Sequence, residues 1–126
     1  MTFDLTSEQE LIRVTAREFA ETQIRPIAAE IDRDARFPHE TVKRMGELGL
    51  MGMVIPERWG GSAAGAVAYV VALEEIARVC ASHAVVMSVN NSLYGAPIAR
   101  FGNDAQREQF LIPVATGHAH GCFGLT

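Results

Sequence analysis

Residues 84–93 read Ala84-Val85-Val86-Met87-Ser88-Val89-Asn90-Asn91-Ser92-Leu93. They are apolar around most of the circumference of a helix, which is typical of the central helix of a bundle. Buried Asn and Ser side chains are costly unless their polar atoms are hydrogen-bonded. The stretch therefore predicts a central helix whose Asn and Ser side chains either have buried partners or line a cavity.

Helical patterns continue on both sides of this central stretch. Apolar residues recur at three- and four-residue spacing, which predicts further helices. Long ones are expected at residues 7–34, 66–80 and 103–117, and a short one at residues 39–48. Long helices joined by short connections are typical of bundles. The sequence therefore predicts an all-α fold, an up-and-down helical bundle.

Helix starts and interruptions are indicated by a few residues. Ser7 and Glu10 have the spacing of a capping box at the first start, and Asn103 and Gln106 have it at the last. Pro26 lacks an N–H and crowds the preceding turn, so we expect it to kink or restart the first helix.

The end of the chain changes character. Residues 118–126 form a short, strand-like apolar segment after a wholly helical pattern. A lone strand leaves its backbone groups unpaired, so we expect more protein after Thr126. The prediction is a helical domain at residues 1–117 and, at residues 118–126, the first strand of a middle β-domain that follows it.

Three potential metal ligands alternate in this last segment. His118, His120 and Cys122 would face one side of a strand, and His and Cys are zinc ligands. A fourth ligand is missing nearby, and paired ligand motifs are absent from the sequence. The favoured interpretation is an exposed loop that leads into the strand, with no metal.

Composition and charge argue against a nucleic-acid partner and a membrane span, and they bear on the cellular compartment. The formal net charge is −4, and the basic residues are interleaved with acids, so a nucleic-acid partner is not expected. Cys80 and Cys122 are far apart, and the first residues lack a basic targeting segment, which favours a cytoplasmic protein. Residues 79–99 carry no charge but contain Ser, His and Asn, so we interpret them as a buried helix and not as a membrane span.

Two other patterns have a functional and a structural interpretation. The glycine-rich residues 59–65 lack the spacing of a phosphate cradle, so a flexible connector is favoured. Glu74 and Glu75 are adjacent carboxylates, but neighbours in a helix point about 100° apart. Surface salt bridging, with Arg78 one turn after Glu74, is favoured over acid–base chemistry.

The whole chain resembles the N-terminal helical domain of the acyl-CoA dehydrogenases, the flavoenzymes of fatty-acid and amino-acid catabolism. Residues 87–94 are most similar to the short-chain, butyryl-type members. The motifs that carry the resemblance are Leu5-Thr6-Ser7-Glu8-Gln9-Glu10, Leu48-Gly49-Leu50-Met51-Gly52, Ile55-Pro56-Glu57-Arg58-Trp59-Gly60-Gly61, Glu74-Glu75-Ile76-Ala77-Arg78, Asn91-Ser92-Leu93, Phe101-Gly102 and Cys122-Phe123-Gly124-Leu125-Thr126.

The resemblance implies an FAD enzyme, usually a homotetramer, that oxidises the Cα–Cβ bond of an acyl-CoA and passes electrons to electron-transferring flavoprotein. The last motif matches the opening of the first family signature. By the same resemblance, cofactor-binding positions are Phe123, Leu125 and Thr126. Substrate-binding positions are Val89, Asn90 and Leu93.

The family's catalytic glutamate lies beyond the stretch that this chain matches, so we expect no catalytic residue among the 126 residues and no activity of the chain alone. The alternative is a stand-alone helical interaction module derived from the same domain, which binds a partner through an exposed apolar face and has no enzymatic activity.

Overall fold

The computed structural model of the chain describes residues 3–125. Within this range the α-helices and π-helical turns join into five rods, and there is no strand. The segments are α1 (Ser7–Phe19), η1 (Ala20–Ile24), α2 (Arg25–Arg33), α3 (His39–Glu47), η2 (Leu50–Gly52), η3 (Glu57–Trp59), α4 (Gly65–Ala77), α5 (Ala81–Ser88), η4 (Val89–Gly95), α6 (Ala96–Phe101), α7 (Asp104–Gln106), η5 (Arg107–Leu111) and α8 (Ile112–Ala115). The expected all-α fold is confirmed.

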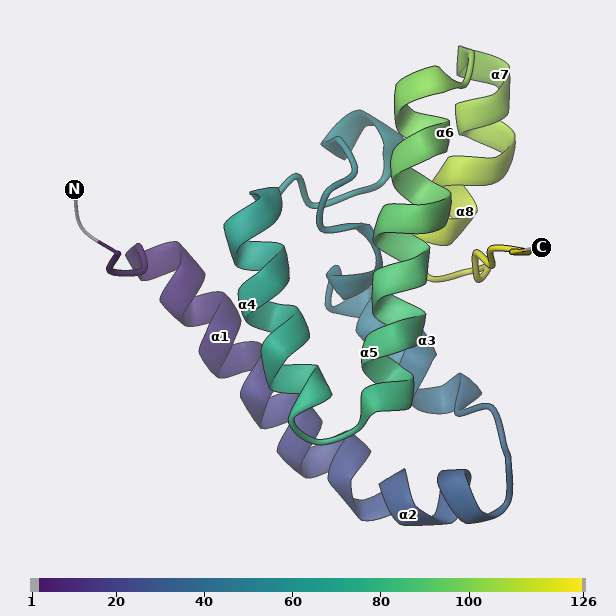
Figure 1. Cartoon of the computed structure of the whole chain (residues 1–126). Coiled ribbons are helices and arrows are strands. Elements are labelled where there is room, and N and C mark those ends of the chain that lie inside the picture. Colours follow the sequence, from purple (N-terminus) through teal and green to yellow (C-terminus); the bar gives the residue numbers. More distant parts are fainter. Residues whose placement is uncertain (1–2, 126) are drawn as a thin grey trace.

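The π-helical turns η1, η4 and η5 lie directly before prolines. Pro26, Pro97 and Pro113 each stand at the start of the α-helical segment that follows the turn. The residue before each proline donates its N–H to the carbonyl five positions back. The wider turn accommodates a ring that would clash with the carbonyl four positions back in a regular α-helix. The kink expected at Pro26 is seen in Figure 1, where α2 turns away from the direction of α1.

The capping boxes are partly as expected. Asn103 caps α7, with reciprocal hydrogen bonds of 2.9 Å to and from Gln106. At α1, however, the capping residue is Thr6 and its partner is Gln9, so the expected Ser7–Glu10 box is wrong by one residue. Both pairs have the same spacing in a run of polar residues, and the extended backbone of Thr6 decides between them.

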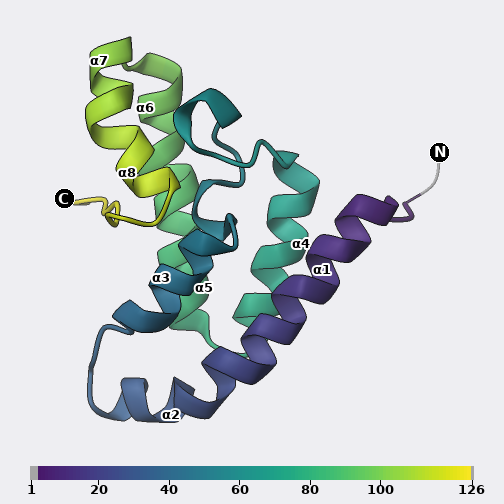
Figure 2. The ribbon, with the colours of Figure 1, turned by 180° about the vertical axis from the view of Figure 1, so that it is seen from behind.

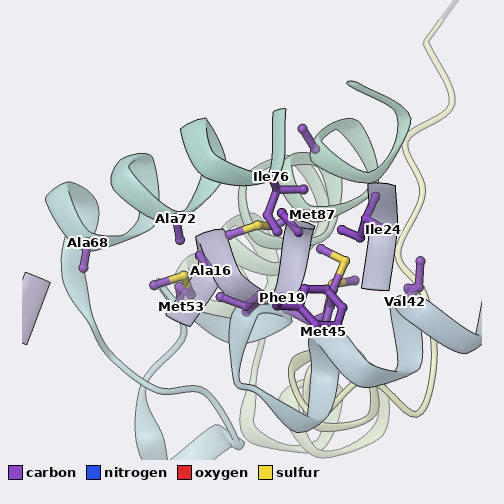
Figure 3. Packing of buried hydrophobic residues seen from close by; sticks show 14 residues of the cluster. Ala16, Phe19, Ile24, Val42, Met45, Met53, Ala68, Ala72, Ile76 and Met87 are labelled. Carbon is purple, nitrogen blue, oxygen red and sulfur yellow. The ribbon is translucent and has the colours of Figure 1, made fainter. Parts of the chain in front are cut away.

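The main core lies between the rods. α1 and α4 lie side by side in both views of the ribbon, and the long rod of α5 and α6 stands beside α4 (Figures 1 and 2). Large fully buried side chains meet between them, as Figure 3 shows for Ile24, Met45, Ile76 and Met87. Fourteen buried residues form this cluster, which is ample for one domain of this size.

A second, smaller core fixes the end of the bundle. Ile55 and Trp59 pack against Leu111 and Ala115, so the loop after α3 is joined to the last helical rod. This cluster places η2, η4 and α8 next to one another, and the polar residues of the central helix lie at that junction.

The segment after α8 leaves the bundle without regular structure. Residues 118–125 contain no strand, and they end on the side of the domain away from the N-terminus (Figure 1). A strand needs a neighbouring strand for its hydrogen bonds, and residues 3–125 offer none. The boundary at residue 117 and the strand at 118–126 therefore stay predictions.

Candidate functional site

Asn90 is a fully buried polar residue at the junction of four segments. Its Nδ2 donates to the carbonyl oxygens of Met51, at 2.8 Å, and Val114, at 3.1 Å. Its Oδ1 accepts a hydrogen bond of 2.9 Å from the backbone N–H of Gly121. Both amide atoms are thus satisfied by backbone groups, which is what a buried amide needs.

Asn91, the next residue on η4, is equally buried and equally well bonded. Its Nδ2 donates to the carbonyl oxygens of Leu50 at 2.9 Å and Met87 at 3.0 Å, and its Oδ1 accepts from Val54 N–H at 3.4 Å. Of the two alternatives for these polar residues, the structure supports buried partners over a lined cavity.

Another side of the central helix presents apolar side chains to solvent. Val85 is 59 % exposed and Leu93 is 46 % exposed, while Val89 between them is half-buried. Residues four apart share one face of a helix, so these three form a stripe, named here the Val85–Leu93 stripe. A shallow hollow of about 300 Å³ adjoins it and is lined by Leu73, Ala77, Ala81, Ala84, Val85 and Ser88.

The predicted cofactor-binding residues lie on the segment that leaves the bundle. Phe123 is 54 % exposed and Leu125 is 85 % exposed, and a methyl group added at Gly124 would meet nothing within 4 Å. Among the described residues, the backbone amides of residues 122–125 make no hydrogen bond. Apolar side chains beside amides without an internal partner are compatible with a planar ring that has polar edges, such as the flavin that the resemblance implies. Thr126 lies outside the described residues.

Gly121 is the point at which this segment is attached to the bundle. Besides its hydrogen bond to Asn90, it lies against the ring of Tyr94, because a Cβ added at Gly121 would come within 2.4 Å of Tyr94 Cγ. Asn90 and Tyr94 are one turn apart on η4. Only glycine fits between them without a shift of the chain.

The glycine-rich loop at residues 59–65 is held by hydrogen bonds to the chain before it and leaves few N–H groups for a phosphate. The backbone N–H groups of Ser62 and Ala63 donate to the carbonyls of Gly52 and Ile55. A Cβ added at Gly61 would lie 2.0 Å from the Ile55 carbonyl oxygen, so the loop is tightly packed. Its N–H groups are used internally, so the expected connector into α4 is a hydrogen-bonded loop.

Glu75 is buried, which the sequence did not indicate. Its side chain accepts hydrogen bonds from Arg17 and Arg78, and these guanidinium groups hold the pKa of the Glu75 carboxyl below its usual value, Arg17 contributing most. Arg78 pairs with Glu75 and Glu21, so the expected Glu74–Arg78 pair is not the one that forms. The carboxylate serves an ion pair between helices and does not face a cavity.

The histidines of the last segment have separate contacts. His118 Nδ1 lies 2.9 Å from Thr116 Oγ1, whereas His120 stacks against Phe37 with ring centroids 5.4 Å apart. Burial and the neighbouring His39 lower the pKa of His120. Within residues 3–125, no group of three or more His, Cys, Asp or Glu side chains is placed to hold a metal ion. Over the same range, no helix combines the length and the apolar character that crossing a bilayer requires.

Comparison with known proteins identifies the family. The model of the acyl-CoA dehydrogenase N-terminal domain matches residues 6–118. The chain belongs to this family. The acyl-CoA dehydrogenase resemblance drawn from its motifs is thereby confirmed.

Curated relatives are similar over the whole chain. The mitochondrial short-chain specific acyl-CoA dehydrogenase of Bos taurus is 48 % identical over 123 residues, which are 98 % of this chain and 30 % of the relative. The short-chain specific acyl-CoA dehydrogenase of Clostridium acetobutylicum is 44 % identical over 126 residues, 100 % of this chain and 33 % of the relative. The chain thus spans about a third of the length of the relatives it matches.

Solved structures are similar to the whole chain. Butyryl-CoA dehydrogenase from Megasphaera elsdenii superposes with a TM-score of 0.91 and 35 % identity, over 100 % of this chain and 34 % of that one. A chain in a structure of the electron transferring flavoprotein of Acidaminococcus fermentans has a TM-score of 0.95 and 36 % identity. The match covers 100 % of this chain and 33 % of that one.

Sequence reasoning about this acyl-CoA dehydrogenase domain missed the attachment of the last segment. Gly121 and Tyr94 were not singled out, although a lone glycine before an apolar run is a signal of close backbone approach. Asn90 was noticed as a buried polar residue, but its partner 31 positions away is a tertiary contact that no local pattern reveals.

Proposed function

We propose that this chain is the N-terminal domain of an FAD-dependent acyl-CoA dehydrogenase that oxidises the Cα–Cβ bond of a short-chain acyl-CoA to the 2-enoyl-CoA. The observation that carries the proposal is 48 % identity across 98 % of the chain to a short-chain specific acyl-CoA dehydrogenase. Because the chain matches about a third of that relative, the proposal assigns the chemistry to the whole protein and a supporting role to this domain.

In this proposal the Val85–Leu93 stripe forms one wall of the acyl pocket. An acyl chain is apolar, and transfer of its methylene groups from water to such a wall is favourable. Val89 and Leu93 are the predicted substrate contacts on the stripe. Asn90 directly follows Val89 but is fully buried and bonded to three backbone groups, so its contact with substrate stays a prediction.

The same proposal assigns the flavin contact to the last segment. Phe123 and Leu125 would lie against the ring, and Thr126 would hydrogen-bond to it. The flavin, when bound, supplies the acceptor for the hydride. The chain's own part is to bind and orient the ring and to exclude water beside it.

No side chain of this domain is assigned the catalytic base. Glu75 is occupied by Arg17 and Arg78, and Glu74 is on the exposed side of α4. We therefore propose that the 126-residue chain alone has no dehydrogenase activity. Further proposals are a homotetramer, electron transfer to electron-transferring flavoprotein, a place in fatty-acid β-oxidation and a cytoplasmic location. The similarity to a chain from an electron transferring flavoprotein structure supports the choice of electron acceptor.

A spectroscopic experiment tests the proposal. The full-length protein that carries this domain is purified, and its visible spectrum is recorded before and after anaerobic addition of butyryl-CoA. Flavin bands that bleach on addition are expected. A protein without flavin bands that captures no acyl-CoA would overturn the proposal and favour the interaction module. Succinyl-CoA is the control ligand, because its terminal carboxylate is unfavourable beside an apolar wall.

A further inference from the structure

We propose that Asn90 is a positioning residue for the flavin-facing segment: it holds the backbone of Gly121 and so sets the direction of residues 122–125. This inference rests on the proposed function, because it concerns the segment to which the flavin contact is assigned. The role concerns the backbone of Gly121 and does not require Asn90 to touch substrate or flavin.

The first support is the distribution of the three hydrogen bonds of Asn90. Two of them bind its Nδ2 to the carbonyls of Met51 and Val114, at 2.8 and 3.1 Å, which fixes the side chain in the bundle. The third leaves Oδ1 as the acceptor for Gly121 N–H at 2.9 Å. The Asn90 amide therefore holds Gly121, the residue before the segment, at a fixed position relative to η2 and α8.

The second support is the contact between Gly121 and Tyr94. A Cβ at Gly121 would lie 2.4 Å from Tyr94 Cγ and 2.6 Å from Tyr94 Cβ, so the backbone of Gly121 rests directly on this side chain. Tyr94 blocks movement toward the helix, and Asn90 prevents movement away from it. The two residues together define one position for Gly121.

The third support is the lack of other attachments further along. Phe123 and Leu125 are largely exposed, and within the described residues the amides of 122–125 make no hydrogen bond. The last fixed point before Phe123 is therefore Gly121, two residues earlier. A substitution at Asn90 should therefore change the position of Phe123, although the two side chains belong to different parts of the fold.

Asn91 offers a matched control for a merely structural role. It is the neighbouring residue, it is also 0 % exposed, and it also donates to two backbone carbonyls. Its acceptor atom, however, faces Val54 and not the last segment. Asn91→Ala should lower the free energy of unfolding about as much as Asn90→Ala does, but it should leave the hydrogen bond that holds Gly121 intact.

Amide hydrogen exchange tests the attachment directly in the full-length protein. The exchange rate of Gly121 N–H is compared with that of Ala119 N–H, which is held by the Pro113 carbonyl at 2.9 Å. In Asn90→Ala the ratio of the two rates should rise by about tenfold, and in Asn91→Ala it should stay unchanged. Equal ratios in the two variants would overturn the proposal.

Flavin affinity tests the consequence. Asn90→Ala should weaken FAD binding by about tenfold and alter the visible circular dichroism of the bound flavin, whereas Asn91→Ala should do neither. Gly121→Ala serves if Asn90→Ala does not fold, because it displaces the segment and leaves both bundle hydrogen bonds of Asn90 in place. Unchanged FAD affinity in Gly121→Ala overturns the positioning role.

The two readouts separate this inference from the proposed function. A wild-type protein that binds no FAD contradicts the proposed function, and with it the flavin-directed role of Asn90. A wild-type protein that binds FAD, with equal affinities in the Asn90→Ala and Asn91→Ala variants, contradicts the positioning role alone.

Discussion

Arg17 on α1 and Glu75 on α4 are joined by two parallel hydrogen bonds. Arg17 Nε donates to Oε2 at 2.9 Å, and Nη2 donates to Oε1 at 2.6 Å. Glu75 is only 6 % exposed, and Arg78 Nε adds a further contact of 3.2 Å. A buried carboxylate is tolerated when it is paired and hydrogen-bonded in this way, and the pair links the two helices that lie side by side in Figure 1.

Replacing Glu75 should therefore weaken the bundle. Glu75→Gln removes the charge and replaces one of the two acceptor oxygens by an NH2 group, which cannot accept from a guanidinium group. We therefore expect a loss of about 1–2 kcal/mol in the free energy of unfolding. Urea denaturation at pH 7 measures it. Glu74→Gln, on the exposed side of the same helix, is the control and should change stability by less than about 0.5 kcal/mol. Equal losses in the two variants would contradict the role of the pair.

The same pair should make stability depend on acid. Because the pKa of Glu75 is lower in the folded chain than the usual 4.5, its contribution is present above pH 4.5. It is lost as the pH falls through the lower folded value. The difference in unfolding free energy between the wild type and Glu75→Gln should thus shrink below pH 4.5 and be constant between pH 5.5 and 7. A difference that grows on acidification would show that the pKa of Glu75 is raised in the folded chain and not lowered.

His83 should produce a second pH dependence, at higher pH. It is 0 % exposed, its Nε2 lies 2.7 Å from Thr41 Oγ1, and its Nδ1 lies 3.2 Å from Cys80 Sγ. Burial lowers the pKa of His83 from its usual 6.5, so below pH 6.5 the unfolded chain binds the proton that the folded chain excludes. Stability should therefore fall as the pH drops below 6.5, by at most about 1.4 kcal/mol per pH unit.

His83→Gln tests this origin, because glutamine has no charged form. Urea midpoints measured between pH 7.5 and 5.5 should fall less steeply in the variant than in the wild type. His118→Gln, at an exposed histidine, should keep the wild-type slope. Parallel slopes for the wild type and His83→Gln would exclude His83 as the titrating group.

The tight loop before α4 gives a steric prediction. In Gly61→Ala the new Cβ would lie 2.0 Å from the Ile55 carbonyl oxygen, which is backbone and cannot turn aside. We expect a loss of at least ~2 kcal/mol, seen as a clear decrease in Tm. Gly124→Ala is the matched control, since its Cβ would meet nothing within 4 Å, and its Tm should be unchanged. A Gly61→Ala protein with wild-type Tm would mean that the loop relaxes freely.

The helices were predictable because their patterns are local. The periodicity around Met87 and the Asn103–Gln106 capping box depend on residues within one or two turns, and both were recovered. The π-helical turn before Pro97 was not predicted, because a proline indicates that the helix is disturbed without indicating the form of the disturbance. A kink, a break and a wider turn can each accommodate the proline ring and its lack of an N–H donor.

The candidate site was predictable only in outline. The resemblance supplied the site positions on the central helix and on the last segment, but residues 79–99 were expected to be buried, and the exposure of Val85 and Leu93 was not predicted. The buried ion pair of Glu75 and the Asn90–Gly121 hydrogen bond join residues far apart in sequence. Glu74 and Glu75 differ in burial only because of where α1 lies against α4. Such differences arise from packing and are invisible to local spacing.

Leu93 provides the last prediction, which concerns the proposed acyl pocket. Its side chain is 46 % exposed on the Val85–Leu93 stripe, so Leu93→Trp should fold normally and project a larger ring toward the substrate. In the full-length enzyme we expect kcat/KM for hexanoyl-CoA to fall about tenfold more than that for butyryl-CoA, because a shortened pocket excludes the longer chain first. Leu11→Trp, 66 % exposed on α1, is the control and should leave both values unchanged. A uniform loss for the two substrates would show that Leu93 does not limit the length of the acyl pocket, and unchanged values for both would place Leu93 outside the pocket.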